Sequence, residues 1–194
     1  MRRLFYPTSV AIAGLSTSET NLAASILSNL EDFGYEGRVY GVGRSGGSIR
    51  GVTIYPSIRE LPEAVDVVVF LTPSHLLPGL FEDCGARGID RGIVLSAGLT
   101  EFADGRKDLE DEILATARRY GILFVGPNTM GVINLMNNFA APFSQMGAEY
   151  FRRGDVGIFA QSGTVGPFIA YNLGEAEFGA STIIMGGNKL CLDE

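Results

Sequence analysis

The sequence has 194 residues, 46% of them hydrophobic, and a formal net charge of −7 at neutral pH. This length allows one sizeable core, or one domain with part of another, and the acidic charge argues against nucleic acid as a partner. No apolar run reaches the roughly 18 residues of a membrane span, and no long apolar segment follows the N-terminal arginines, so we expect neither a transmembrane helix nor a signal peptide.

Strand-like and helix-like segments alternate along most of the chain. Short, continuous apolar runs predict strands, and the run at residues 66–73 is the clearest because it is rich in β-branched residues and ends in proline. Apolar residues at helical spacing, such as Leu22, Ile26 and Leu30, predict the helices. In chain order, we expect a strand at 9–14, a helix at 20–34, a strand at 38–42, an extended piece at 51–57, a helical turn at 58–65, a strand at 66–73, a helix at 76–88, a strand at 91–98, a helix at 105–121 and a strand at 122–128.

Continuous apolar strands separated by helices predict an α/β fold with a parallel sheet that is buried on both faces. Right-handed crossovers place the carboxyl ends of such strands along one edge, where the ligands of open α/β sheets bind. The turns at that edge carry small or polar residues, which let a ligand approach the backbone. They are the turns at residues 14–19, 41–47, 72–75, 96–101 and 126–131.

A second strand–turn–helix–strand unit begins near residue 155. About 40 residues cannot enclose a core alone. We therefore expect this unit to pack on the first domain or on another chain, for example by self-association, or to be the start of a longer domain. We divide the chain into a first domain at 1–137, a linker at 138–153 and an incomplete second domain at 154–194.

The turn after the first strand contains one glycine, Gly14, followed by Ser16, Thr17 and Ser18. Because Ser16 and Glu19 have the spacing of a capping box, one interpretation is a capped helix without a ligand. The other interpretation is an anion held by free N–H groups and the dipole at the helix N-terminus. Glu19 would oppose that anion if its carboxylate pointed inward.

Arg44 stands near the end of the second strand, where nicotinamide dinucleotide binders usually place an acidic residue for the ribose hydroxyls. The G-x-G-x-x-G pattern of those binders is also missing from the opening turn. An arginine here favours a phosphate on the ribose or elsewhere, as in a 2′-phosphorylated dinucleotide or coenzyme A. The alternative is a solvated surface arginine.

His75 is the only histidine, and no serine or cysteine nucleophile accompanies it in a recognisable local signature. We therefore expect a role at the rim of the ligand edge rather than in catalysis, and no histidine-based metal site. Cys84 and Cys191 have no ligand spacing. This argues against a disulfide framework or a zinc site and fits a reducing cytoplasm.

The second unit repeats the pattern of a strand, a small polar turn and a helix. Ser162, Gly163 and Thr164 form that turn. They either cap the helix or expose N–H groups and hydroxyls as a second anion site, and the turn alone is weak evidence for the site.

Taken in order, these motifs resemble those of the NDP-forming acyl-CoA synthetases, which include ADP-forming acetate–CoA ligase and, more distantly, the alpha subunit of succinyl-CoA synthetase. The resemblance covers essentially the whole chain, and the ordered set is more specific than any one motif. The matching segments are FYPTSVAIAGLS, NLEDFGYEGRVYGVGR, LPEAVDVVVFLTP, SAGLTE, GPNTMGVIN, GIFAQSGTVG and GGNK.

The resemblance implies a Rossmann-like, CoA-binding first domain and a partial flavodoxin-like second domain of the succinyl-CoA synthetase type. It implies that the opening turn holds the phosphate-bearing part of CoA, that Asn128 lies near the thioester end and the acyl substrate, and that Ser162, Gly163 and Thr164 receive the phosphate of a phosphohistidine. The CoA contacts that it implies by position are Gly14, Ser16, Thr17, Arg44, Thr72, Pro73, Ser74, Ala97, Gly98 and Glu101.

The resemblance also implies the reaction of the complete enzymes, in which a small carboxylate, CoA and ATP are interconverted with an acyl-CoA, ADP and phosphate. The phosphorylated histidine and the ATP-grasp part, which binds nucleotide and magnesium, lie outside this sequence, and His75 lacks the glycine-rich setting of that histidine. We therefore expect CoA binding without turnover, and a partner domain or subunit. Thr20 and Ala23 stand where the family often has glycine, and Thr20 bears on how closely the backbone can approach the pyrophosphate.

Two other functions stay open. A free-standing CoA-binding regulatory protein would bind CoA and have no partner that carries the phosphorylated histidine and the ATP-grasp part. An NAD(P)-dependent oxidoreductase would bind a nicotinamide cofactor, which the residue pattern disfavours.

Overall fold

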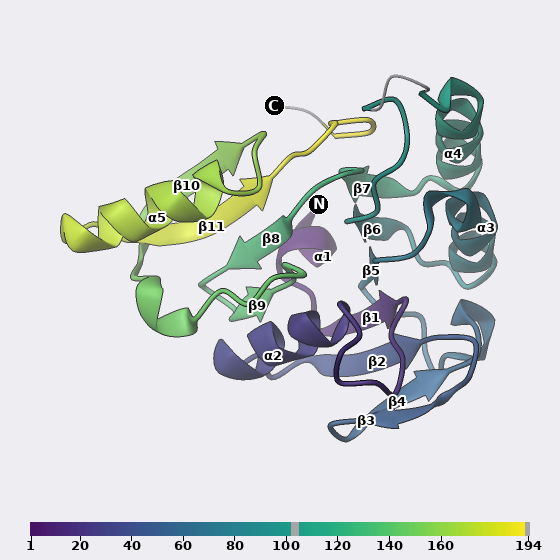
Figure 1. Cartoon of the computed structure of the whole chain (residues 1–194), viewed down its shortest axis with the longest axis horizontal. Coiled ribbons are helices and arrows are strands. Elements are labelled where there is room, and N and C mark those ends of the chain that lie inside the picture. Colours follow the sequence, from purple (N-terminus) through teal and green to yellow (C-terminus); the bar gives the residue numbers. More distant parts are fainter. Residues whose placement is uncertain (102–104, 193–194) are drawn as a thin grey trace.

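The computed structural model describes residues 1–101 and 105–192, and it contains two sheets (Figure 1). The larger sheet consists, in spatial order, of β3 (Gly47–Ile49), β4 (Val52–Tyr55), β2 (Arg38–Val42), β1 (Ser9–Ala13), β5 (Val67–Phe70), β6 (Arg91–Val94) and β7 (Leu123–Val125). Adjacent strands in this sheet are parallel, except for β3 and β4, which pair antiparallel. The predicted α/β fold with a mostly parallel, Rossmann-like sheet is therefore confirmed.

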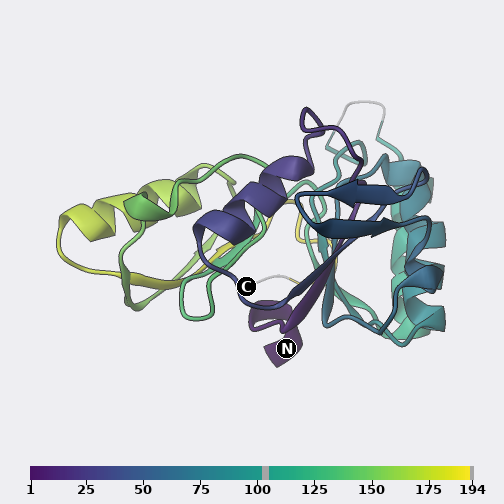
Figure 2. The same ribbon diagram turned by 90° about the horizontal axis from the view of Figure 1, so that it is seen from below.

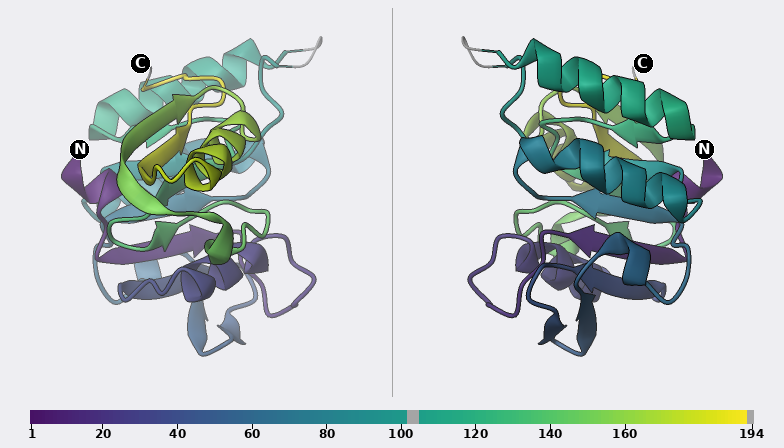
Figure 3. Two further views of the ribbon diagram at one scale, coloured as in Figure 1. Left: turned by 90° about the vertical axis from the view of Figure 1, so that its left-hand side faces the viewer. Right: turned by 90° about the vertical axis from the view of Figure 1, so that its right-hand side faces the viewer.

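Helices cover both faces of the larger sheet. One face carries α3 (Leu77–Ala86) and α4 (Lys107–Tyr120), and α2 (Ala24–Asp32) lies on the other, as Figures 2 and 3 show. Under α3, the Phe81 ring contacts Phe70 of β5 and Phe124 of β7, with ring centroids 5.2 and 5.3 Å apart. All three side chains are fully buried, so this aromatic cluster forms the centre of the core on the α3–α4 face.

The smaller sheet contains the second βαβ unit that the sequence predicts. It consists, in spatial order, of β10 (Arg153–Ala160), β11 (Ala180–Met185), β8 (Gly131–Asn134) and β9 (Phe139–Ala140). β10 and β11 are parallel and are joined by α5 (Val165–Glu175), whereas β8 pairs antiparallel with both β11 and β9. The smaller sheet thus begins with β8, within the predicted first domain. The segment 138–153 includes β9 and the 3₁₀ turn η3 (Ala148–Tyr150).

The two sheets share one core on the α2 side of the larger sheet. Val132 of β8 and Phe139 of β9 lie in the same buried cluster as Val10 and Ile12 of β1. The fully buried Asn29 of α2 fastens the segment after β9, because its Nδ2 donates to the carbonyls of Pro142 and Ser144, at 2.8 Å each, and its Oδ1 accepts from the Met146 N–H. The expected linker is therefore held against the larger sheet by α2.

Short elements complete the chain. The expected extended piece is β4, and the expected helical turn contains the 3₁₀ turn η1 (Ile58–Glu60). The sequence pattern does not indicate the helix α1 (Arg2–Phe5), the strand β3 or the 3₁₀ turn η2 (Ser74–Leu76). Within the described ranges, no helix is both long enough and apolar enough to cross a membrane.

Replacing Phe81 by alanine should lower the free energy of unfolding by about 3–5 kcal/mol, because it leaves a cavity between β5, β7 and α3. Phe178→Ala is the matched control, since the Phe178 side chain is 62% exposed and its loss should change stability by less than about 0.5 kcal/mol. Urea denaturation of both variants measures the difference, and equal effects would contradict the assignment of the core.

Candidate functional site

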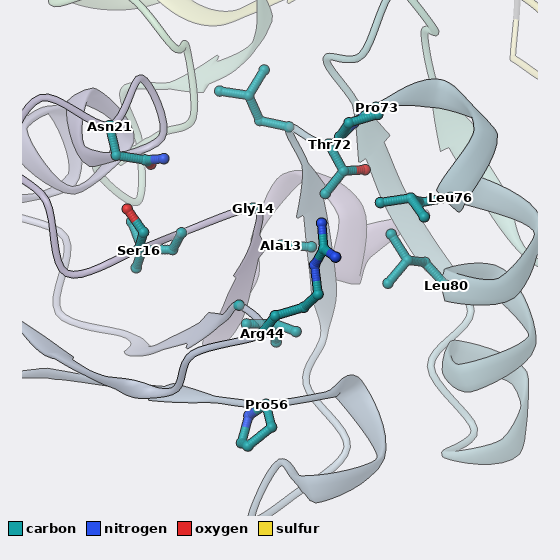
Figure 4. A pocket seen from close by; sticks show the side chains of 14 residues that line it. Ala13, Gly14, Ser16, Asn21, Arg44, Pro56, Thr72, Pro73, Leu76 and Leu80 are labelled. Carbon is teal, nitrogen blue, oxygen red and sulfur yellow. The ribbon is translucent and has the colours of Figure 1, made fainter.

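A cavity of about 410 Å³ opens at the carboxyl edge of the larger sheet, beyond the ends of β1, β2, β4 and β5 (Figure 4). Its lining comes from the loops that follow these strands and from the first turns of the α3 region. The lining residues are Ala13, Gly14, Leu15, Ser16, Asn21, Val42, Gly43, Arg44, Pro56, Leu71, Thr72, Pro73, Leu76 and Leu80. Five of the predicted site residues, Gly14, Ser16, Arg44, Thr72 and Pro73, are therefore brought together.

Gly14 makes a close backbone approach at the floor of this cavity. Its φ is +101°, and a Cβ built on it would lie 2.1 Å from the carbonyl oxygen of Leu71 at the end of β5. Only glycine combines that φ with the absence of a side chain. The chain can therefore leave β1 close beside β5 and expose backbone at the cavity floor.

The helix after this turn begins later than the sequence suggests. α2 starts at Ala24, so the expectation of a helix from residue 20 with a capping box between Ser16 and Glu19 is wrong. Glu19 instead pairs with Arg50 at 2.7 Å, and the first amides of α2 donate to carbonyls of the preceding loop. The polar loop before Ala24 forms its own turns, because its hydroxyl and amide side chains bond to nearby backbone. Glu19 thus faces a cation and does not oppose an anion in the cavity.

Arg44 supplies the positive charge of the cavity. It extends from the loop after β2, and its guanidinium points into the cavity toward Thr72 (Figure 4). Arg44 forms no salt bridge with any residue of the described ranges. An unpaired guanidinium in a concave site can bind a phosphate or carboxylate by charge-assisted hydrogen bonds.

Thr72 and the α3 region form the wall opposite Ser16 and Asn21 (Figure 4). The Thr72 hydroxyl oxygen is buried and has no hydrogen-bond partner among the residues that the structure describes. Leu76 and Leu80 add an apolar surface one helical turn apart. These leucines and Asn21 are not among the residues predicted for the site, although the helical spacing of the two leucines is a signal in the sequence.

The other predicted contact residues lie outside the cavity lining. Thr17 is exposed on the loop after β1 and Ala97 is exposed on the loop after β6, whereas Ser74 is buried. The Ser74 hydroxyl donates to the carbonyl of Gly98 at 3.3 Å, which links the loops after β5 and β6. These residues lie along the same edge of the sheet but do not line the cavity.

Glu101 is engaged by its own loop and by the second unit. Its carboxylate accepts hydrogen bonds from the N–H groups of Gly98 and Leu99 and from the side-chain amide of Asn188 at 2.9 Å. Partial burial by itself raises the pKa of Glu101, but hydrogen bonds from these groups and from its own N–H lower it below the ordinary value of a glutamate. The carboxylate form, and any stability that it confers, is therefore lost only as the pH falls through that lowered pKa.

The second predicted anion site lies by a different cavity. Gly163 and Thr164, at the start of α5, line an apolar cavity of about 360 Å³ together with Met130 and Phe168. Ser162 caps its own turn, since its hydroxyl accepts from the Thr164 N–H at 3.4 Å. The predicted CoA contacts and the predicted phosphate contacts therefore do not share one cavity in this chain.

His75 is exposed in η2 and does not line the cavity. Cys84 belongs to α3 and is buried in the core, where burial raises the pKa of its thiol; Cys191 is partly buried. Across residues 1–101 and 105–192, no group of three or more histidine, cysteine, aspartate or glutamate side chains could hold a metal ion.

Comparison with known proteins agrees with this geometry. Residues 8–134 match the family described as "CoA binding domain". The chain is 36% identical over 200 residues to acetate–CoA ligase [ADP-forming] I of Archaeoglobus fulgidus, covering 100% of this chain and 28% of that protein. It is 32% identical to the alpha subunit of acetate–CoA ligase [ADP-forming] I of Pyrococcus furiosus, covering 100% of this chain and 42% of the subunit.

A solved structure shows the same arrangement of elements. The apo form of dinucleotide forming acetyl-coenzyme A synthetase 1 of Ca. Korarchaeum cryptofilum superposes with a TM-score of 0.89 at 32% identity, covering 100% of this chain and 41% of that one. The chain thus spans less than half the length of each of these relatives. It belongs to the CoA-binding domain family and corresponds to the CoA-binding portion of the ADP-forming acyl-CoA synthetases.

Proposed function

We propose that the chain binds coenzyme A in the cavity at the carboxyl edge of the larger sheet. The observation that carries this proposal is the Arg44 guanidinium, which points into a cavity floored by the Gly14 backbone, inside the segment that matches CoA-binding domains. Arg44 would bind a phosphate of CoA by a charge-assisted hydrogen bond. Thr72 lines the same cavity and would border the ligand.

The neighbouring loops would extend this site along the sheet. Thr17 and Ser16 would border the phosphates, while Pro73, Ser74, Ala97 and Gly98 would border the pantetheine arm. Asn128 follows β7, which lies two strands from β5. At about 4.8 Å per strand this is roughly 10 Å, a distance that an extended pantetheine arm can span. Asn128 would then lie near the thiol end.

For the complete protein we propose the reaction of an NDP-forming acyl-CoA synthetase, which interconverts a small carboxylate, CoA and ATP with an acyl-CoA, ADP and phosphate. Bound CoA would supply the thiol that accepts the acyl group. The phosphorylated histidine and the ATP-grasp part, with its nucleotide and magnesium, would come from outside this sequence. Ser162, Gly163 and Thr164 would hold the phosphoryl group of that histidine by the dipole and N–H groups at the start of α5.

The second unit offers a surface for the partner that such a reaction requires. Tyr150, Phe168 and Tyr171 are between 41% and 64% exposed, and they line one cavity beside α5. β10 is an edge strand of eight residues. Clustered exposed apolar side chains beside an open strand edge are typical of an interaction surface. We propose that a partner domain or subunit covers it.

Calorimetric titration with CoA, NAD⁺ and NADP⁺ tests the proposed ligand, because all three contain an adenosine and a pyrophosphate. We expect saturable binding of CoA and weaker binding of both dinucleotides. Saturable binding of a dinucleotide without a response to CoA would contradict the proposal and favour an oxidoreductase. Binding of CoA by a protein that has no partner carrying the other parts would instead favour a free-standing regulatory protein.

Replacing Arg44 by alanine should weaken CoA binding by about 1–2 kcal/mol, because a charge-assisted phosphate contact is lost. Arg118→Ala is the control, since Arg118 is an exposed arginine on α4, away from the cavity lining. Titrations of both variants with CoA and with 3′-dephospho-CoA show which phosphate Arg44 binds. An unchanged affinity in Arg44→Ala would remove Arg44 from the site.

Replacing Gly14 by alanine should destabilise the fold by roughly 1–3 kcal/mol and abolish CoA binding at concentrations that saturate the parent chain. Gly88→Ala separates the strain of a positive φ from the steric clash with Leu71. Gly88 also has a positive φ, of +70°, but its Cβ would meet nothing within 4 Å. Thermal melts and CoA titrations of both variants provide the comparison. If Gly14→Ala behaves like Gly88→Ala, the close approach to Leu71 is not what shapes the cavity.

A further inference from the structure

The carboxylate of Glu101 begins a chain of hydrogen bonds that links the two units. It accepts from Asn188 Nδ2 at 2.9 Å, and Asn188 Oδ1 accepts in turn from Asn128 Nδ2 at 3.2 Å. Glu101 and Asn128 lie in loops at the carboxyl edge of the larger sheet, after β6 and β7. Asn188 lies in the turn after β11 of the smaller sheet. The chain of hydrogen bonds therefore crosses from one sheet to the other.

Backbone contacts hold Asn188, the middle residue of this hydrogen-bond chain, in place. The Asn188 N–H donates to the Pro127 carbonyl at 2.9 Å, and the Leu190 N–H donates to the Gly126 carbonyl at 3.0 Å. Gly187 has a φ of +61°, and a Cβ there would lie 2.3 Å from the Pro127 oxygen. The turn after β11 thus lies directly against the loop after β7, and Asn188 can contact both Glu101 and Asn128.

The charge of Glu101 fixes the direction of every hydrogen bond in the chain. A carboxylate only accepts, so Asn188 must turn its Nδ2 toward Glu101 and its Oδ1 toward Asn128. Asn128 must then turn its Nδ2 toward Asn188. The Oδ1 atom of Asn128 then points away from Asn188. This atom accepts no hydrogen bond from any residue within 1–101 and 105–192.

We propose that Glu101 is a positioning residue that acts through Asn188 to make Asn128 a hydrogen-bond acceptor for the ligand. Asn128 would then bind an N–H or S–H donor at the thiol end of CoA, and not a carboxylate or acyl oxygen, which would need a donor. Glu101 would not touch CoA itself, because its two oxygens are occupied by Gly98, Leu99 and Asn188. This inference rests on the proposed function, since it takes CoA as the ligand of the same sheet edge.

The Glu101→Gln variant tests the proposal because it keeps the shape of the side chain and replaces one acceptor oxygen by a donor. The new side-chain amide can turn its NH₂ toward Asn188. Asn188 and then Asn128 would flip, and Asn128 would present Nδ2 in place of Oδ1. We expect CoA affinity to fall about fivefold or more, the scale of a lost hydrogen bond with an unmatched donor. Glu101→Asp, which keeps the charge, should retain more affinity than Glu101→Gln.

Desulfo-CoA identifies the donor group. If the thiol S–H donates to Asn128, the Glu101→Gln change should leave desulfo-CoA affinity unaltered. If a pantetheine N–H donates, CoA and desulfo-CoA should lose affinity equally. Both results support the proposal. Glu112→Gln, at an exposed position of α4, is the control and should bind CoA like the parent chain.

Side-chain amide NMR provides a readout that needs no ligand. In the parent chain, the Asn188 amide resonances should shift as acid protonates Glu101, and in Glu101→Gln the Asn128 amide resonances should move because that group has flipped. If the parent chain binds CoA while Glu101→Gln matches Glu112→Gln in affinity and leaves the Asn128 resonances in place, the proposal is wrong. A parent chain that does not bind CoA would overturn the proposed function and the ligand assignment, while the NMR result would still decide whether Glu101 orients Asn128.

Discussion

The candidate site depends on the close approach between the Gly14 backbone and the Leu71 carbonyl. β1 and β5 are parallel neighbours, and the Leu71 N–H donates to the Ala13 carbonyl at 2.9 Å. A side chain at position 14 would place its Cβ 2.1 Å from the Leu71 oxygen, so glycine alone lets the chain turn away from the sheet here. The cavity opens between this turn and the loops after β2 and β5. Arg44 reaches into the cavity because it lies in the loop that follows β2, the strand next to β1.

The second constraint is the way in which the smaller sheet is held to the larger one. α2 lies on the face where both sheets contribute to one buried cluster, and the Asn29 side chain bonds to three backbone groups in residues 142–146. At the carboxyl edge, the turn after β11 bonds to the loop after β7. The two units are therefore joined at a helix face and at the ligand edge. This places Asn188 where it can orient Asn128.

Sequence reasoning predicted the parallel sheet well, because each buried strand is a continuous apolar run and each helix has one apolar face. It failed where tertiary contacts override local pattern. The loop before Ala24 reads as the start of a helix, but its polar side chains form turns and Glu19 pairs with Arg50, which is distant in sequence. The pairing of β8 with β11 joins residues about fifty positions apart, and no local periodicity indicates such a partner. Gly14, Ser16, Arg44, Thr72 and Pro73 lie around one cavity at the sheet edge. Only the structure separates these residues from the predicted ones that lie elsewhere or bond to each other.

Mapping the backbone amides of the chain by ¹H–¹⁵N NMR during a CoA titration shows where the cofactor binds. We expect the largest shifts on residues 14–16, on Arg44 and on Thr72, with smaller shifts reaching Asn128. The polar cavity of about 560 Å³ at the opposite edge of the sheet, which Tyr35 and Asn137 line, should stay unchanged. Shifts that are confined to that opposite cavity, or no shifts at millimolar CoA, would show that CoA does not bind at the carboxyl edge of the sheet.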